Sequence, residues 1–185
     1  MESIVRNAVT GKSNSTTGGQ VVDLAEGPKI VVMGCGGAGN NSVNRIARLG
    51  ISGAELIAVN TDKQHLTLVH DSVKKLLIGQ TVTRGLGAGG YPEIGAKSAE
   101  VSRAALSQTL EGVDLLFITA GMGGGTGTGA SPVISRIAKE SGALTVAIVT
   151  KPFYFEGTRR SVVAEDGIEK LKEQVDTLIV IPNQR

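Results

Sequence analysis

The glycine-rich stretch at residues 121–129 (GMGGGTGTG) limits what this chain can fold into more than any other segment. It follows an apolar run at 114–120 that predicts a buried strand, and it precedes residues 130–138, whose apolar spacing predicts a helix. Because glycine has no Cβ, a ligand can approach such a backbone closely. The N–H groups and the dipole at a helix start favour anions. With the hydroxyls of Thr126 and Thr128, the stretch predicts a cradle for a chain of phosphates rather than a flexible linker.

Length and composition indicate one domain in a reducing compartment. We expect residues 1–28 to be a mobile extension without a core and residues 29–185 to be the folded domain. The formal net charge of +2 gives no electrostatic case for nucleic acid, and tryptophan is absent. The single cysteine excludes an internal disulfide. No apolar run is long enough to span a membrane, so we expect a cytoplasmic protein.

Apolar runs alternate with helical patterns along the chain. The predicted strands are residues 29–33, 55–59, 74–78, 114–120, 144–149 and 177–181. The predicted helices are residues 42–49, 92–110, 130–141 and 159–173. Strands that are apolar almost throughout are typical of a parallel sheet covered on both faces. We therefore predict an α/β fold, a Rossmann-like doubly wound parallel sheet of about six strands with helices on both faces. A ligand would bind at the carboxyl edge, near the switch point between the first and fourth strands.

Two further glycine-rich loops are expected at the same edge. Residues 34–39 satisfy G-x-G-x-x-G after the first strand, and Asp62 follows at the distance where a dinucleotide-binding fold keeps its ribose-binding acid. We expect the first loop to bring these residues near phosphate or ribose: Gly37, Ala38, Gly39, Asn40 and Asn41. Ala88, Gly89 and Gly90 would close over a terminal phosphate. Three such loops favour a triphosphate, and an NAD(P)-dependent oxidoreductase domain is the alternative.

These motifs resemble those of the tubulin/FtsZ family of GTPases. The segments that carry the resemblance are residues 36–41 (GGAGNN), 59–62 (VNTD), 85–89 (GLGAG), 123–129 (GGGTGTG), 149–153 (VTKPF) and 155–157 (FEG). The resemblance implies the GTP-binding domain of a cytoskeletal GTPase that self-assembles into filaments for cell division. It also implies GTP or GDP as the ligand, with Mg²⁺ bound through the phosphates. Hydrolysis of GTP to GDP and phosphate would need an acidic loop from a neighbouring subunit.

The resemblance also implies which residues bind the nucleotide. Glu156 resembles a ribose-binding residue, Arg160 one near the phosphates, and Asn183 one on the sugar and base side. The full expected set is Gly37, Ala38, Gly39, Asn40, Asn41, Asn60, Asp62, Ala88, Gly89, Gly90, Gly123, Gly124, Gly125, Thr126, Gly127, Thr150, Pro152, Glu156, Arg160 and Asn183. We expect no catalytic residue within this chain and no direct protein ligand to the metal.

The chain departs from the family pattern at two positions and in length. Tyr91 stands where many relatives have Asn, and Gln184 where an acidic residue is common, which leaves the subfamily open and favours an archaeal type. Family members continue into a long central helix, the acidic loop and a second domain. We therefore expect this chain to be a piece of a longer protein that binds nucleotide with little turnover. Membrane tethers and other division proteins at mid-cell would bind regions outside it, and an uncovered apolar sheet face would promote self-association.

Cys35 has two alternative roles at this stage. It lies in the first glycine-rich loop, where a nearby helix start would lower the pKa of its thiol and make it reactive. The simpler interpretation is a small side chain that fills the core.

Overall fold

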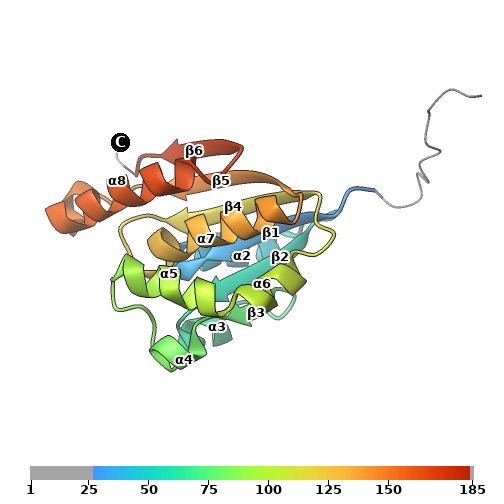
Figure 1. Cartoon of the computed structure of the whole chain (residues 1–185), viewed down its shortest axis with the longest axis horizontal. Coiled ribbons are helices and arrows are strands. Elements are labelled where there is room, and N and C mark those ends of the chain that lie inside the picture. Colours follow the sequence, from blue (N-terminus) through green and yellow to red (C-terminus); the bar gives the residue numbers. More distant parts are fainter. Residues whose placement is uncertain (1–26, 184–185) are drawn as a thin grey trace, which may run out of the picture.

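The computed structural model describes residues 27–183, which form a single parallel sheet with helices on both faces (Figure 1). Its six strands are β1 (Ile30–Cys35), β2 (Glu55–Asn60), β3 (Lys74–Leu77), β4 (Leu115–Gly121), β5 (Leu144–Thr150) and β6 (Thr177–Ile181). They lie in the order β3-β2-β1-β4-β5-β6, and every neighbouring pair is parallel. The predicted fold class is confirmed. Most of the predicted 1–28 extension, and Gln184, lie outside the described residues.

The helices connect the strands. They are α2 (Gly36–Leu49), α3 (Lys63–Thr67), α4 (Gln80–Thr83), α5 (Pro92–Val101), α6 (Arg103–Thr109), α7 (Thr126–Glu140) and α8 (Thr158–Lys172), with a 3₁₀ helix, η1 (Tyr154–Glu156). The short elements α3, α4 and η1 were not predicted, because segments of three to five residues are too short to show an apolar period. Among residues 27–183, no helix is both long and apolar enough to cross a bilayer.

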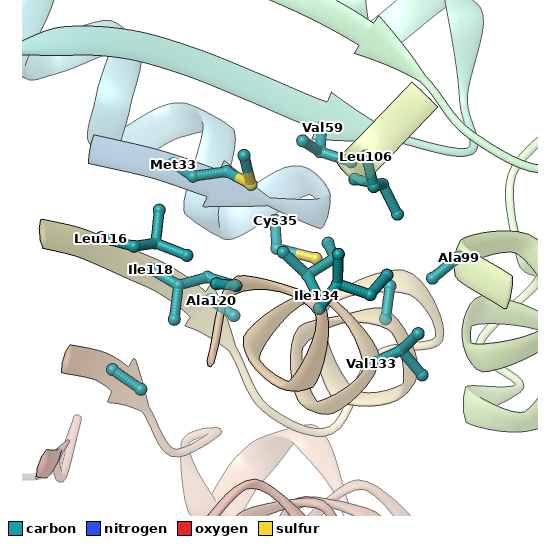
Figure 2. Packing of buried hydrophobic residues seen from close by; sticks show 14 of the residues in the cluster. Met33, Cys35, Val59, Ala99, Leu106, Leu116, Ile118, Ala120, Val133 and Ile134 are labelled. Atoms are coloured by element: carbon teal, nitrogen blue, oxygen red, sulfur yellow. The ribbon is translucent and has the colours of Figure 1, made fainter. Parts of the chain in front are cut away.

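The alternation of side chains along the strands divides the core between the two faces. Met33 of β1 packs in the larger cluster with residues of α5, α6, α7 and α8, whereas Val32 packs with α2 and α3 on the other face. Figure 2 shows the larger cluster, in which Met33 and Cys35 of β1 and Ile118 of β4 lie near Ile134 of α7. Helices on both faces fix the strands, so the loops that follow them meet at one edge of the sheet.

Two glycine-rich stretches that were predicted as loops are partly helical. Helix α2 begins at Gly36 rather than at residue 42, and α7 begins at Thr126 rather than at residue 130. The glycines allow the helix backbones to sit directly on their neighbours, because a Cβ on Gly39 would lie 2.2 Å from the carbonyl oxygen of Thr119. A Cβ on Gly129 would lie 1.8 Å from the carbonyl oxygen of the residue at 92. Close packing, in addition to ligand access, therefore accounts for the glycine content.

The predicted helix over residues 92–110 is interrupted. Ser102, with φ −99° and ψ 12°, separates α5 from α6. The Oγ of Ser102 accepts a hydrogen bond of 2.8 Å from the backbone N–H of Gly79, the residue before α4. This contact ties the interruption to a neighbouring turn, and a sequence period alone does not show such a contact.

One part of the sheet is less well covered. On the face that carries α2, no described helix packs over β5 and β6. The side chains of Ile179 and Ile181 on β6 are 46% and 44% exposed, and Ile148 on β5 is half-buried. The described residues therefore include an apolar sheet face that is open to solvent.

Candidate functional site

The turns after β1 and β4 touch each other at the switch point of the sheet. A Cβ on Gly36, whose φ is +73°, would lie 2.8 Å from the backbone nitrogen of Gly127. A Cβ on Gly121 would lie 2.6 Å from the Cβ of Ala38. The two helix starts thus lie side by side, and their N–H groups and dipoles face the same edge. This edge is where an open α/β sheet binds its ligand.

A cavity of about 190 Å³ opens at this edge. It is lined by Gly89, Gly90, Tyr91, Gly123, Gly124, Arg159, Arg160 and Val163. No atom lies within 4 Å of the position that a Cβ would take on Gly90 or Gly124. At these two residues the bare backbone therefore faces open space. The cavity combines backbone accessible to a ligand with two arginine residues, whose positive charge suits a phosphate.

A second cavity, of about 220 Å³, adjoins the first. It is lined by Lys151, Pro152, Tyr154, Ser161, Ala164, Glu165, Pro182 and Asn183. The two cavities share a wall at Gly123, where a Cβ would lie 2.8 Å from the carbonyl oxygen of Arg160 and 3.4 Å from the Cγ of Pro152. The pair suits an elongated ligand with its phosphates in the first cavity and a polar, uncharged part in the second.

Arg160 and Glu156 form an ion pair at the start of α8. The other carboxylate oxygen of Glu156 accepts a hydrogen bond of 2.9 Å from the backbone N–H of Phe153. Both oxygens of Glu156 are therefore engaged within the loop. Arg159 has no carboxylate partner among the described residues, and its guanidinium carbon lies 5.6 Å from the ring centroid of Tyr91.

The structure places the predicted residues of the first loop at different depths. Gly39 and Asn40 are fully buried, and the Nδ2 of Asn40 donates a hydrogen bond of 3.3 Å to the carbonyl oxygen of Val59. The Oδ1 of Asn40 is buried without a hydrogen-bond partner. Ala38 and Asn41 are exposed and Gly37 is partly exposed. A ligand at the surface of this turn would meet these three residues first.

Other predicted residues hold the loops together. Asn60 accepts a hydrogen bond of 2.9 Å from the backbone N–H of the next residue, and Asp62 caps α3 by accepting one of 3.2 Å from the N–H of His65. The hydroxyl of Thr126 is 2.7 Å from that of Thr61, which joins the loop after β2 to the start of α7. The carbonyl oxygen of Thr150 accepts a hydrogen bond of 2.9 Å from the N–H at residue 122.

Two buried glycines set the spacing between the loops. Gly125 is packed against the loop before α5, since a Cβ on it would lie 2.8 Å from that of Ala88. A Cβ on Gly127 would lie 2.8 Å from the carbonyl oxygen of Gly121. Neither glycine lines the two cavities. Their contribution to the site is the close approach of one loop to another.

Of the two alternative roles of Cys35, the reactive thiol is wrong. The thiol is fully buried against the start of α7, with its Sγ 3.7 Å from the carbonyl oxygen of Thr126. Burial raises the pKa of the Cys35 thiol to about 12. Desolvation of the thiolate outweighs any effect of the nearby helix start. The role as a small core side chain is confirmed.

Tyr91, Arg159 and Val163 line the first cavity but were not in the predicted set. Arg159 begins the predicted helix 159–173, and a charge at the start of a helix does not by itself indicate a binding residue. The available signal was its position next to Arg160, at the start of the helix that follows the 155–157 segment. The contact between Arg159 and Tyr91 joins distant parts of the chain, so it cannot be inferred from the sequence.

Comparisons with known proteins agree with this geometry. The family model described as "Tubulin/FtsZ family, GTPase domain" matches residues 29–185. A protein named cell division protein FtsZ 2 from Methanocaldococcus jannaschii is 57% identical over 157 residues, which cover 85% of this chain and 41% of the relative. FtsZ 2 from Halobacterium salinarum is 52% identical over 158 residues, 85% of this chain and 40% of the relative.

Solved structures give the same result. An empty FtsZ dimer from M. jannaschii superposes with a TM-score of 0.82 at 51% identity, over 85% of this chain and 46% of that one. CetZ2 from Haloferax volcanii, solved as a protofilament with GTPγS, superposes with a TM-score of 0.71 at 29% identity. The match covers 84% of this chain and 49% of that one. The chain spans about two fifths of the length of the curated relatives it matches. These comparisons support the GTPase hypothesis and not the oxidoreductase alternative.

Proposed function

This chain belongs to the tubulin/FtsZ family as its GTPase domain, and we propose that it binds GTP or GDP across the two adjoining cavities. The phosphates would occupy the cavity beside Arg160, and the ribose and base the cavity that Asn183 lines. The observation that carries this proposal is the bare backbone of Gly90 and Gly124, which faces the phosphate cavity without an obstructing atom. The family match over residues 29–185 supports these residues as the nucleotide-binding domain, with residues 1–28 as an extension.

The proposed binding residues have two kinds of role. Those open to a cavity or to the surface of the first turn would contact the nucleotide: Gly37, Ala38, Asn41, Gly89, Gly90, Gly123, Gly124, Pro152, Arg160 and Asn183. Those engaged in buried or loop contacts would hold the contacting residues in place: Gly39, Asn40, Asn60, Asp62, Ala88, Gly125, Thr126, Gly127, Thr150 and Glu156. Glu156 would exchange part of its pairing with Arg160 for a ribose hydroxyl.

Magnesium would arrive with the nucleotide. Among residues 27–183 there is no group of three or more His, Cys, Asp or Glu side chains that could hold a metal ion. Mg²⁺ keeps several waters and is commonly bound through phosphates, where it neutralises charge during phosphoryl transfer. This chain would itself contribute the arginine residues and the backbone N–H groups that line the first cavity, which would stabilise the phosphate charge.

Turnover by this chain alone would be slow. Phosphoryl transfer relies on positioning a nucleophile and stabilising charge. Both oxygens of Glu156 are engaged within its loop, and Asp62 caps α3. Neither carboxylate is therefore placed to orient a water. We propose that the longer protein hydrolyses GTP to GDP and phosphate with acidic residues from a neighbouring subunit.

At the level of the cell, the proposed role is filament formation in division. The relatives are named cell division proteins, and two matching structures are titled as a dimer and a protofilament. These names support self-association during cell division for the longer protein, and we propose the cytoplasmic side of the division site as its location. Membrane tethers and other division proteins would bind it through regions outside this chain.

Calorimetric titration tests the nucleotide proposal. The 185-residue chain is titrated with GDP, ADP and NAD⁺ in the presence of Mg²⁺, and we expect saturable binding of GDP alone. Binding of NAD⁺ in preference to GDP would overturn the proposal, and so would equal affinity for GDP and ADP. Turnover is measured separately by phosphate release from GTP, and a rate equal to that of an intact, polymerising relative would contradict slow hydrolysis by this chain.

A further inference from the structure

The first cavity contains a cation that the proposed nucleotide set does not use. The guanidinium of Arg159 lies over the ring of Tyr91, with 5.6 Å between its central carbon and the ring centroid. Both residues line the cavity together with Gly90 and Gly124, whose backbone is open. Arg159 comes from the first turn of α8 and Tyr91 precedes α5, so the pair joins the two elements across the cavity.

We propose that Arg159, positioned by Tyr91, binds the terminal phosphate of a nucleoside triphosphate and so distinguishes it from a diphosphate. The proposal rests on the nucleotide site proposed above. It adds to that site a specificity residue and a residue that positions it.

The charges around the cavity separate the roles of the two arginines. Arg160 is paired with Glu156, whose carboxylate already offsets much of its charge. Arg159 has no carboxylate partner among residues 27–183. An unpaired guanidinium attracts an additional phosphate without first giving up an ion pair. The additional phosphate of a triphosphate is therefore assigned to Arg159, and the phosphates common to both nucleotides are assigned to Arg160.

The backbone of Tyr91 is held in place at the start of α5, and its ring is about half exposed beside the cavity. Its backbone N–H donates a hydrogen bond of 3.0 Å to the carbonyl oxygen of Ala88, and its own carbonyl oxygen accepts one of 3.1 Å from Ile94 at the start of α5. The ring passes close to Gly89, where a Cβ would lie 3.5 Å from it. A cation over an aromatic face is attracted to it, while the N–H groups at the edge of the guanidinium remain free to donate.

The test compares affinities for GTPγS and GDP, measured by calorimetry with Mg²⁺ on the 185-residue chain. A charge-assisted hydrogen bond contributes enough that we expect Arg159→Ala to weaken GTPγS binding by about tenfold. Its GDP affinity should change by less than about twofold. Arg159→Lys keeps the charge and should recover part of the GTPγS affinity. Arg160→Ala should weaken the binding of both nucleotides.

Tyr91 is tested by a pair of variants. Tyr91→Leu removes the aromatic face and should lower the preference for GTPγS over GDP by about threefold, as expected for one exposed cation–π contact. Tyr91→Phe keeps the face and should retain the preference. The matched control is Arg48→Ala, which removes the same charge from the last turn of α2, at the end of that helix away from the site.

The outcomes separate this inference from the proposed function. If the wild-type chain binds both nucleotides and Arg159→Ala weakens both equally or neither, the specificity role of Arg159 is overturned and the nucleotide site stands. If Tyr91→Leu behaves as the wild type, Tyr91 does not position Arg159. If the wild-type chain binds neither GDP nor GTPγS, the proposed function fails, and this inference fails with it.

Discussion

The glycine residues at the carboxyl edge of this sheet differ in what a side chain would meet. A Cβ on Gly39 would lie 2.2 Å from a backbone oxygen, whereas a Cβ on Gly124 would meet nothing within 4 Å. The first residue is therefore glycine because two backbones touch. At the second, a side chain would cost the fold little and would enter the space proposed for phosphates.

Gly39→Ala should destabilise the fold strongly. The new methyl group would overlap the carbonyl oxygen of Thr119, and a contact so short forces α2 away from β4. We expect the free energy of unfolding in urea to fall by about 2–4 kcal/mol. Gly37→Ala is the matched control, because its Cβ would only approach the Nε2 of His65 at 3.5 Å. Equal stability of the two variants would contradict this account of the packing.

Gly124→Ala should separate binding from stability. The Cβ meets no neighbouring atom, so the free energy of unfolding should change by less than about 0.5 kcal/mol. The methyl group would still keep a phosphate from the backbone, and the affinity for GDP should fall by about tenfold or more. Calorimetry and urea denaturation measure the two effects. Unchanged GDP affinity in a stable variant would mean that the phosphates lie elsewhere.

Cys35 should be unreactive in the folded protein. Its thiol is buried, with its pKa raised to about 12, so the thiolate that reacts with iodoacetamide is scarce at pH 8. We expect alkylation in the native state to be slower than in denaturing urea by about 100-fold or more. The chain has one cysteine, so mass spectrometry reports on this residue alone. Rapid native alkylation would show that the region around β1 and α7 opens readily.

At the scale of elements, Asp176 links α7, β5 and β6. Its carboxylate accepts a hydrogen bond of 2.8 Å from the backbone N–H of Thr145, and its backbone N–H donates one of 2.9 Å back to that residue. The Nζ of Lys139, at the end of α7, lies 3.3 Å from the Oδ1 of Asp176. The Thr145 hydrogen bond, followed by the Lys139 charge, holds the pKa of Asp176 below its usual range. A carboxylate with a lowered pKa stabilises the fold above its unfolded pKa and loses this effect as pH falls through the folded value.

Asp176→Asn should therefore reduce stability in a pH-dependent way. At pH 7 we expect a loss of about 1 kcal/mol in the free energy of unfolding, as for one hydrogen bond to a charged group at a partly exposed site. The difference between wild type and variant should shrink as pH falls below the ordinary aspartate value of 3.8. Asp166→Asn, which removes an exposed carboxylate paired with Lys170 on α8, is the control and should have little effect. A loss of stability in Asp176→Asn that is equally large at pH 7 and at a pH below 3.8 would contradict the role of the charge.

The sequence predicted the strands better than the helix starts. The bounds of β6 were predicted as observed, because the apolar run at 177–181 ends at a proline. The starts of α2 and α7 were placed too late, because glycine in a sequence does not show whether it opens a loop or lets a helix touch a strand. At the interruption, the hydroxyl of Ser102 accepts a hydrogen bond from the backbone N–H of Gly79, which is distant in the chain and which no local pattern shows.

The same limit applies to the site. The edge of the sheet and the residues Gly89, Gly90, Gly123 and Gly124 followed from motif positions, and the structure brings them together around one cavity. The pairing of Arg159 with Tyr91 joins residues from α8 and the loop before α5. No local pattern encodes it, because the two residues are 68 positions apart in the chain and meet only in the folded structure.

For the whole molecule, the apolar face of β5 and β6 should promote association. Ile179 and Ile181 are each nearly half exposed on a sheet face that no described helix covers. Contiguous apolar surface of this kind favours contacts between copies. Sedimentation velocity should show association that increases with concentration and that Ile179→Thr weakens. Val162→Thr on α8, where Val162 is 63% exposed, is the control, and a monomeric wild type at all concentrations would contradict the prediction.

The central claim is that the two cavities at the carboxyl edge of the sheet bind a guanine nucleotide. The most direct test is to denature the purified protein and identify any released nucleotide by ion-exchange chromatography against standards. We predict GDP or GTP in an amount close to one per chain, or uptake to that level after incubation with GTP and Mg²⁺. Release of NAD(P) or an adenine nucleotide, or no guanine nucleotide even after that incubation, would contradict the claim.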